Sequence, residues 1–421
     1  MPQSREVVVT GLGAVCPLGV GREAVWTSLA AGKSGVRPIA EFAGTEIPFR
    51  YGGKIEGFEP KEYVQPRKTL KVMSNEIQAA YSAAMLALQD AGLAKESVAP
   101  ERLGVVLGSE MLYGELPELA DAYRQCIVDG VFRQELWAEN AMKNLFPLWM
   151  LKYLPNMAAC HIGIASDAHG PNNSVVEGGV SSLLALLEAS QVISRGHADV
   201  MICGGCGSTL TLGAIPFRGD DHLTKWRGSA EETPRPFDAR RDGTVLGEGS
   251  GMYLLEAREH AEARGAKILA RLLGGSQLFE PLFEGQAQRG TAIAGSITAA
   301  LGQANLQPRD IGFVSANASG SVSGDAVEAQ AIERTLGKVP VTAFKSYYGD
   351  IGAGSGSVEV VASILALQNG QIPMTRNYAQ PDKACPVNVV QGEAEPLKIG
   401  SVMALSQSTT GHASAVIFGA P

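Results

Sequence analysis

Short apolar runs that end at glycine alternate along the chain with longer segments of helical periodicity, and this alternation restricts the fold more than any other feature. The first run, 7–10, leads directly into Gly11. Segment 75–91 then has apolar residues at helical spacing and is followed by Gly92, which is typical of a helix C-terminus. Because buried strands that alternate with helices pack as a sheet with both faces covered, the pattern predicts an α/β fold.

The same alternation starts again after residue 267, so the chain reads as two similar halves. The expected strands are 7–10, 102–107, 198–202, 268–273, 311–316, 339–343 and 414–418, and the expected helices are 75–91, 181–195, 291–304, 325–336 and 357–367. Both series run strand, helix, strand. This indicates a duplicated α/β unit with halves 1–260 and 261–421 and a junction near 258–266.

The charge and hydropathy of the chain exclude several classes of function. With 35 basic and 43 acidic residues, the formal net charge is −8, which does not favour a nucleic-acid partner. The apolar run that starts at Val7 is too short for a signal peptide. No segment combines the length and the lack of charge that a membrane span requires, so we expect no membrane association and a cytoplasmic location.

The cysteines indicate a reducing environment and no metal centre. Six cysteines in 421 residues are too sparse for a disulfide framework. Cys203 and Cys206 have the spacing of a metal or redox pair, but no second pair follows and the residues before them, 198–202, have the pattern of a buried strand. We therefore expect a structural role for both, no metal site and no cofactor.

Several motifs spread over the chain carry a resemblance to one family. They are the opening strand and turn 9–19 (VTGLGAVCPLG), the stretches 155–159 (PNMAA) and 170–172 (GPN), the block 235–251 with RPFD, RDG and GEGSG, and a loop with Lys345, Ser346, Gly349 and Gly356. Together these blocks resemble the β-ketoacyl-ACP synthase family. The resemblance implies a thiolase-like, five-layered αβαβα fold, a dimer, and acyl groups delivered on an acyl carrier protein.

The chemistry of that family requires a cysteine thiolate at the N-terminus of a helix, where the helix dipole stabilises the negative charge. Counted from the motif 170–172, the position of the nucleophile is occupied by Gly179. Glycine has no side chain, so an acyl-enzyme cannot form there. Ser181 and Ser182 follow closely, but no histidine lies near them in sequence to activate a hydroxyl group.

Two histidines of the family stabilise an enolate oxygen during decarboxylation, and both are replaced here. The resemblance places the first at Asn317, whose amide can donate a hydrogen bond but cannot titrate. It places the second at Asp350, and an ionised carboxylate there would repel the developing negative charge. Neither decarboxylation nor condensation is expected.

The groups that support the family's active site are retained. Lys345 matches the family lysine and Glu359 its glutamate partner, while Asp325 and Glu328 match carboxylates on a neighbouring helix. One interpretation is that these buried, hydrogen-bonded charges hold the fold together.

A second interpretation is a repurposed site in which Lys345, Asp350 and Glu177 perform different acid–base chemistry. Glu177 stands two residues before the lost nucleophile, where it could pair with Lys345 or fill space. The aromatic gate of the family is absent from the last loop, and His412 lies there as a further candidate base, although a structural histidine is an alternative.

Two basic clusters match the regions where the family meets its acidic carrier protein. Arg67, Lys68 and Lys71 form the first, and Lys225 with Arg227 form the second. Solvated surface lysines are the alternative interpretation. The segment 145–154 (LFPLWMLKYL) is unusually apolar and aromatic, which is typical of an interface.

Three functions fit these observations. The first is a synthase homologue that does not condense and acts as a partner subunit, like the chain-length factors that form heterodimers with active ketoacyl synthases in fatty acid or polyketide synthesis. Those subunits usually carry glutamine at the nucleophile's position, so a homodimeric binding or scaffolding protein is a variant of this hypothesis. The second is an acyl-transfer or hydrolytic enzyme that uses His412, Glu177 or Asp350. The third is conventional condensation, which the sequence disfavours.

Overall fold

The computed structural model of the protein describes residues 5–40, 47, 49–110, 114–214, 219–282 and 288–421. Most of its strands form one large sheet, whose main path has the spatial order β15-β13-β12-β17-β18-β11-β1-β10-β9-β5-β8. The main strands are β1 (Val7–Cys16), β5 (Leu103–Gly108), β8 (Asn172–Val175), β9 (Val200–Ser208), β10 (Leu246–Ala257), β11 (Ala270–Phe279), β12 (Phe313–Ser315), β13 (Pro340–Thr342), β15 (Asn388–Val389), β17 (Ser401–Gln407) and β18 (His412–Gly419).

The strand order repeats itself on the two sides of the β1–β11 junction. In the first half, β1 pairs with β10 and β10 with β9 in antiparallel register, and β9, β5 and β8 run parallel. In the second half, β11, β18 and β17 are antiparallel, and β17, β12 and β13 are parallel. The same topology therefore occurs twice, as the sequence predicts. Between β1 and β11, which join the two half-sheets, the paired residues are Val8 with Arg271 and Val9 with Ala270.

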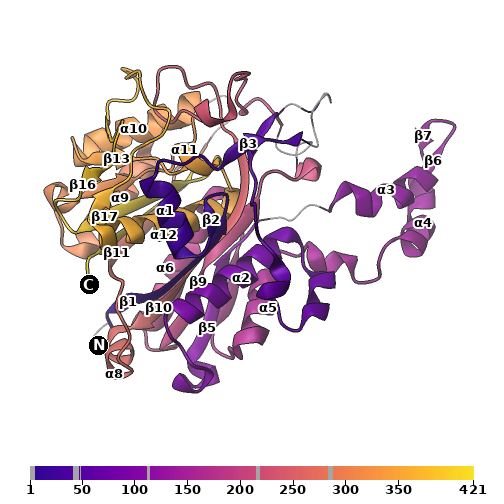
Figure 1. Cartoon of the computed structure of the whole chain (residues 1–421), viewed down its shortest axis with the longest axis horizontal. Helices are drawn as coiled ribbons and strands as arrows, with labels where there is room; N and C mark the ends of the chain where they lie inside the picture. The colour runs from indigo at the N-terminus through magenta and orange to yellow at the C-terminus, as the bar shows by residue number, and fades with distance from the viewer. Residues whose placement is uncertain (1–4, 41–46, 48, 111–113, 215–218, 283–287) are drawn as a thin grey trace.

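Helices separate and cover the two half-sheets in five layers (Figure 1). The helices are α2 (Asn75–Asp90), α5 (Met157–Ser166), α6 (Ser181–Ser194), α9 (Thr291–Ala304), α10 (Val322–Leu336) and α12 (Ser355–Asn369). Helices α2 and α5 contact the first half-sheet, and α9 and α10 lie on the side of the second. Helices α6 and α12 contact each other and strands of both halves. This is the αβαβα arrangement of the thiolase-like fold.

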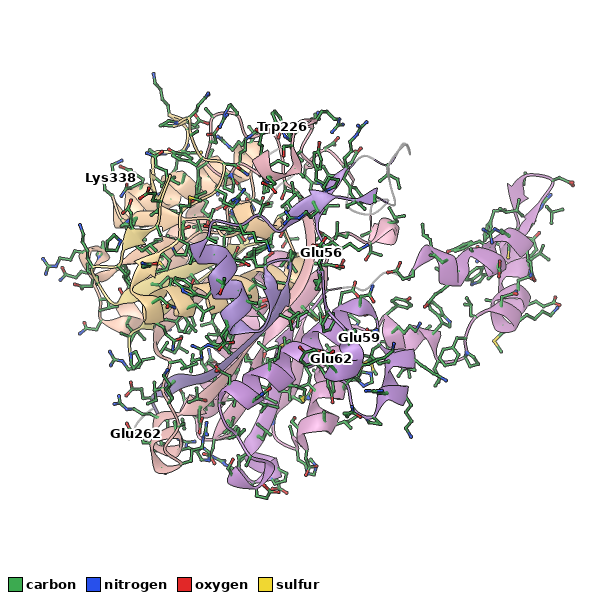
Figure 2. All side chains as sticks on the ribbon, in the orientation of Figure 1. Glu56, Glu59, Glu62, Trp226, Glu262 and Lys338 are labelled. Atoms are coloured by element: carbon green, nitrogen blue, oxygen red, sulfur yellow. The ribbon has the colours of Figure 1, made fainter. Side chains whose placement is uncertain are left out.

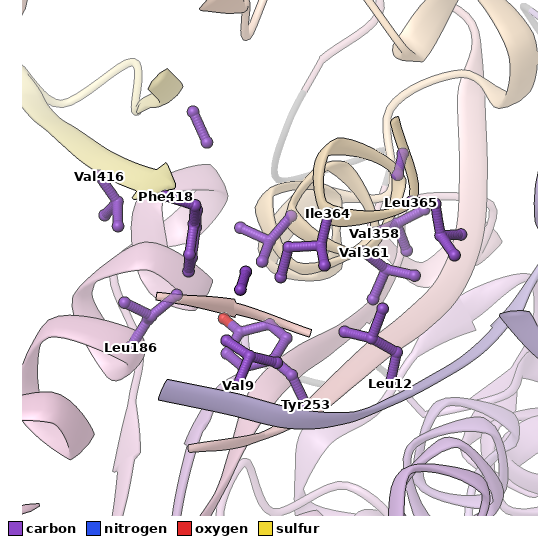
Figure 3. Packing of buried hydrophobic residues seen from close by; sticks show 14 of the residues in the cluster. Val9, Leu12, Leu186, Tyr253, Val358, Val361, Ile364, Leu365, Val416 and Phe418 are labelled. Atoms are coloured by element: carbon purple, nitrogen blue, oxygen red, sulfur yellow. The ribbon is translucent and has the colours of Figure 1, made fainter. Parts of the chain in front are cut away.

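The central layer contains the largest hydrophobic cluster of the described residues, and its packing explains why α6 and α12 are apolar on more than one face. Figure 3 shows Val9 and Tyr253 of the first half-sheet and Phe418 of the second near Leu186 of α6 and Ile364 of α12. All five side chains are fully buried. A helix that is covered by a sheet on each side cannot present a polar face to solvent.

Glycines in β1 allow α2 to pack closely against the sheet. A Cβ atom on Gly11 would lie 2.2 Å from the Ala87 carbonyl oxygen, and one on Gly13 would lie 2.0 Å from that of Ala83. Both distances are far below van der Waals contact. β1 extends to Cys16, six residues beyond the expected run, because these glycines continue the strand rather than ending it.

An arm that projects from the body was not expected from the sequence (Figure 1). It comprises α3 (Leu116–Gln125), the hairpin β6–β7 (Ile127–Val128 and Val131–Phe132), α4 (Trp137–Asn144) and the 3-10 helix η7 (Trp149–Lys152). In α3 only Ala122 is buried, and α4 has no buried residue. The arm therefore leaves many apolar side chains uncovered, among them Met142 at 87% exposed.

The cysteines have the structural placement that the sequence predicts. Cys203 and Cys206 are buried within β9 and are free thiols. Burial raises the pKa of Cys206 to about 12, so its thiol stays protonated and unreactive. Among the described residues no group of histidine, cysteine and carboxylate side chains is arranged to hold a metal ion. No helix in that part of the chain is long and apolar enough to cross a membrane. The junction between the proposed halves falls at α8 (Arg258–Ala263), and the division at residue 260 stays a prediction.

Candidate active site

The candidate site forms where the first turns of α6 and α12 meet. Each helix is preceded by a short glycine-containing 3-10 turn, η8 (Gly178–Val180) before α6 and η12 (Gly352–Gly354) before α12, and these turns contact each other. The Ser182 hydroxyl donates a hydrogen bond to the Ala353 carbonyl oxygen and ties the two turns together. The site is therefore assembled from the two repeated units of the fold.

Gly179 lies in the turn that leads into α6, at the helix N-terminus where the family resemblance places a nucleophile. An added Cβ would meet only one group within 4 Å, the Gln407 carbonyl oxygen at 3.2 Å. The Gly179 carbonyl accepts a hydrogen bond of 2.9 Å from the Ser406 hydroxyl. A small side chain could thus be accommodated with a slight displacement, but the residue present supplies no reactive group.

Neither neighbouring serine has the environment of a nucleophile. The Ser181 hydroxyl donates to the Gly178 carbonyl at 2.7 Å and accepts from the Glu177 amide at 2.8 Å. Ser181 and Ser182 are fully buried, and the Ser182 hydroxyl is engaged by Ala353. A serine nucleophile needs a base within hydrogen-bond reach, and the hydrogen bonds of these two hydroxyls go to backbone groups.

Lys345 forms a buried network with the residues that the resemblance assigns to it. Its Nζ donates to Glu359 Oε1 at 2.9 Å and to the Asn317 backbone and side-chain oxygens at 2.8 and 2.9 Å. Burial alone would lower the pKa of Lys345, but the carboxylates of Glu359 and Asp350 raise it, so the ammonium group stays charged. Because the Asn317 side-chain oxygen accepts from Lys345, its amide NH₂ group is left to donate elsewhere.

Two buried carboxyl groups on α10 support the loop that carries Asn317. Glu328 Oε1 accepts from the backbone N–H of Asn317 at 2.8 Å. Asp325 accepts from the backbone amides of Phe237, Ser319 and Gly320 at 3.0 to 3.1 Å. Burial raises the pKa of Glu328 to about 8 and that of Asp325 to about 6. Glu328 is therefore largely protonated at neutral pH.

Asp350 stabilises its own loop. Its Oδ1 accepts from the Gly352 amide at 3.1 Å and from the Ser355 hydroxyl at 2.9 Å. Gly349 precedes it with φ of 81°, in the left-handed region that favours glycine. The carboxylate thus holds the turn that begins α12, which is the role of an Asx turn.

Glu177 and His412 meet at the rim of the site, on two separate elements. Glu177 Oε2 lies 3.3 Å from His412 Nδ1, without hydrogen-bond alignment, and the two side chains are 45% and 29% exposed. The His412 ring also contacts that of Phe279 at 4.9 Å between centroids. The pairing of Glu177 with Lys345 that the sequence left open is wrong, since the buried lysine binds Glu359 and the solvated glutamate lies at the rim.

The structure thus brings most of the expected site residues together, and it adds others that the sequence did not indicate. Ser406 and Ser355 hold the Gly179 carbonyl and the Asp350 carboxylate, and Phe279 contacts His412. Serine and phenylalanine are too common to signal such roles on their own. The sequence could have indicated a site role for Ser406, because Ser406 begins the segment 406–412, which lacks the aromatic gate of the family.

The residues of the two basic clusters are all exposed, on different elements of the surface. Arg67, Lys68 and Lys71 lie on the 3-10 helix η3 (Arg67–Val72). Lys225 and Arg227 flank Trp226, whose ring stacks at 3.8 Å under the guanidinium of Arg235. Figure 2 shows Trp226 well separated from the acidic residues Glu59 and Glu62. None of the five cations forms an ion pair with another described residue.

The repeated half-sheet topology, the central helix layer and a site at the start of α6 and α12 define a thiolase-fold protein. The model of the β-ketoacyl synthase N-terminal domain matches residues 4–261, and that of the C-terminal domain matches residues 283–379. The chain belongs to the β-ketoacyl synthase family.

Relatives of two kinds align with almost the whole chain. A 3-oxoacyl-[acyl-carrier-protein] synthase 2 from Synechocystis is 30% identical, with 97% of each chain covered. A putative polyketide β-ketoacyl synthase 1 from Streptomyces halstedii is 32% identical, with 99% of each chain covered. Among solved structures, the ishigamide ketosynthase/chain length factor matches with a TM-score of 0.87 and 27% identity, over 99% of this chain and 100% of the other.

Proposed function

We propose that this protein is a ketoacyl synthase homologue that does not condense and that serves as a partner subunit in fatty acid or polyketide synthesis. The observation that carries the proposal is Gly179 at the N-terminus of α6, where the family chemistry requires a thiolate. The retained Lys345–Glu359 pair and the α10 carboxylates then serve to hold the fold and the loops around an inactive site.

Electrostatics at the second replaced position support the same conclusion. Asp350 accepts hydrogen bonds from the Gly352 amide and the Ser355 hydroxyl, and its carboxylate contributes to the raised pKa of Lys345. A fixed negative charge beside a developing enolate oxygen would raise the barrier to decarboxylation. Asn317 supplies at most a neutral amide donor in place of an imidazole.

A second thiolase-fold chain is the partner that fits the uncovered surfaces. β8 is the last strand of the sheet, paired on one side only with β5, and an open edge is a template for pairing. Ile164 of α5 is 81% exposed, and Val176, just after β8, is 45% exposed. The exposed apolar side chains of the arm are further uncovered surface. The chain-length factor in one structural neighbour is a protein of the proposed kind.

An acyl carrier protein is the second proposed partner. The exposed cations of η3 and those beside Trp226 are available to steer an acidic protein, because none of them is neutralised by a described acidic neighbour. The name of the Synechocystis relative includes the acyl carrier protein. If the protein is a partner subunit, docking of the carrier would present the growing acyl chain to the active synthase subunit of the heterodimer.

A second candidate function rests on the Glu177–His412 pair. Glu177 Oε2 lies 3.3 Å from His412 Nδ1, and both side chains are partly exposed near residue 179. In this function the carboxylate orients the imidazole, which acts as a base for acyl transfer or hydrolysis. Conventional condensation is the least favoured function, since each replaced group would remove several kcal/mol of transition-state stabilisation, on the order of 3 kcal/mol for one oxyanion donor.

One set of assays tests these functions. The purified protein, alone and mixed with an active synthase encoded near it, is incubated with acyl and malonyl groups on a carrier protein. We expect no two-carbon extension by the protein alone, and a stable heterodimer with the synthase by size and mass. Extension by the protein alone would refute the proposal. Turnover that His412→Ala abolishes would support the second candidate instead.

A further inference from the structure

A cavity of about 330 Å³ lies on the α2 side of the first half-sheet, apart from residue 179. Its walls come from four places in the chain: the loop after β4 (Tyr51–Gly53), the first turns of α2, the end of β9 and the start of β10. This volume is at the lower end of the range for small-molecule sites. The cavity is therefore large enough for an organic molecule and too large for a bare metal ion.

The polar part of the wall contains two carboxylates, together with the side-chain amides of Asn75 and Gln78. Glu76 of α2 and Glu248 of β10 line the cavity, with Lys54 as the one cation among the described lining residues. Burial raises the pKa of both carboxyl groups, and at Glu248 the charge of Glu76 adds to the rise while that of Lys54 opposes it. Glu76 also raises the pKa of Glu115, at the root of the arm. These carboxylates repel one another across a poorly solvated space.

The acidic character continues outside the cavity. The loop that forms one wall carries Glu56, Glu59 and Glu62 on its solvent side, as Figure 2 shows. Lys61 neutralises part of this charge through Glu59 at 3.9 Å. The two carboxylates inside the cavity disfavour an anionic ligand, including an ionised fatty acid.

The rest of the wall is apolar and suits methylene groups. Ile55, Phe58, Pro60 and Ala79 supply it. An aromatic ring such as that of Phe58 also attracts an ammonium group. Glu248 Oε1 already accepts from the Ile55 amide at 2.9 Å, which fixes its position but leaves further acceptor capacity on the carboxylate. A wall that contains both carboxylates and apolar side chains matches an aliphatic chain that carries amino groups.

We propose that this cavity binds an aliphatic polyamine, whose ammonium groups pair with Glu76 and Glu248 while its methylene groups pack on Ile55 and Phe58. The bound cation removes the repulsion between the two carboxylates. The cavity also adjoins the candidate site, because a Cβ on Gly207 in its wall would lie 2.3 Å from the Ile351 carbonyl oxygen, next to Asp350.

Titration calorimetry with spermidine at pH 8 and low salt tests the proposal on the purified full chain. We expect saturable binding with one molecule per chain, which weakens at pH 5 as the carboxyl groups become protonated. The double variant Glu76→Gln/Glu248→Gln should lose at least about 10-fold in affinity. It should melt no lower than the parent, because the substitutions relieve repulsion. Glu395→Gln, at an exposed position on β16 (Glu395–Pro396), is the matched control and should bind as the parent does.

Three results would overturn the proposal: no saturable binding of spermidine, equal binding by the double variant, or displacement of spermidine by decanoate. The last would indicate an acyl-chain pocket. None of these measurements involves condensation or a partner subunit, so the outcome is independent of the proposed function.

Discussion

Lys345 Nζ lies 2.9 Å from Glu359 Oε1, and the two side chains are 2% and 1% exposed. The lysine begins α11 (Lys345–Tyr348) and the glutamate lies in α12, so the ion pair joins the site loop to the central helix layer. Removal of one partner leaves an uncompensated charge in a region that water does not reach. The pair therefore contributes to stability whether or not the site is active.

Lys345→Met should lower the free energy of unfolding by about 3–5 kcal/mol, because Glu359 loses its counter-ion while it stays buried. Chemical denaturation measures the change. Lys338→Met is the control, since Lys338 is exposed (Figure 2) and its Nζ donates to the Pro386 backbone carbonyl, not to a buried carboxylate. The double variant Lys345→Met/Glu359→Gln should recover part of the loss. Equal stability of the parent and Lys345→Met would show that the pair contributes nothing.

Glu328→Gln should change how stability depends on pH. Burial raises the pKa of Glu328 from its ordinary 4.5 to about 8, so the folded state binds this proton more tightly than the unfolded state. The stabilisation from the bound proton is complete below pH 4.5 and is lost as the pH rises to about 8. Each tenfold difference in proton affinity is worth ~1.4 kcal/mol. We therefore expect the stability of the variant relative to the parent to increase from pH 5 to pH 8.5.

Urea unfolding at several pH values measures this dependence. Glu333→Gln, a less buried position on the same helix, should keep the pH profile of the parent. If Glu328→Gln and the parent showed parallel profiles, the carboxyl group would not carry a raised pKa in the folded protein.

Gly179→Cys should fold, because an added Cβ meets only the Gln407 carbonyl at 3.2 Å. The new thiol at the start of α6 should accept an acyl group, which intact-protein mass spectrometry would detect. No two-carbon extension should follow, because Asn317 and Asp350 do not stabilise the enolate. Gly302→Cys, at an open position on α9, controls for nonspecific acylation. Extension by Gly179→Cys would show that the replaced histidines are dispensable.

Charge reversal of η3 should weaken carrier binding. For Arg67→Glu/Lys68→Glu/Lys71→Glu, we expect association with an acyl carrier protein to slow by about 10-fold or more at low salt, since opposite charges steer the encounter. Surface plasmon resonance at two salt concentrations measures the rate. Lys398 is exposed and lies more than 300 positions from η3 in the sequence, so Lys398→Glu should have little effect on the association rate. Unchanged rates in the triple variant would exclude η3 as the docking surface.

Polar substitution of the arm should weaken partner association without loss of stability. Leu148 and Met150 are 50% and 56% exposed, so Leu148→Ser/Met150→Ser removes little buried area within the chain. We expect an unchanged melting temperature and a heterodimer that dissociates in size-exclusion chromatography. Val322→Ser, at an exposed apolar position on α10, is the control. A heterodimer that survives the arm substitutions would place the interface elsewhere.

Much of the fold followed from local patterns. The helix 291–304 was expected with its exact bounds, and the helix 75–91 to within one residue, because their apolar periodicity and terminal residues are unambiguous. β10 was missed although it has 12 residues, because its first half, Gly247–Gly251, is glycine-rich and reads as a loop. Backbone pairing with β1 on one side and β9 on the other holds this glycine-rich segment as a regular strand.

The sequence alone determined the chemistry that is missing: the absence of a side chain at residue 179 and of imidazoles at 317 and 350 can be read without coordinates. The family resemblance already assigned Glu359 to Lys345, but only the tertiary structure excluded Glu177 as an alternative partner. Lys345 pairs with Glu359 rather than Glu177 because burial at the α11–α12 junction selects the enclosed partner, while Glu177 lies in solvent beside His412. The tertiary structure also decided that Glu76 and Glu248, 172 positions apart, line one cavity. The sequence could not show this, because contacts between distant segments leave no periodic signal.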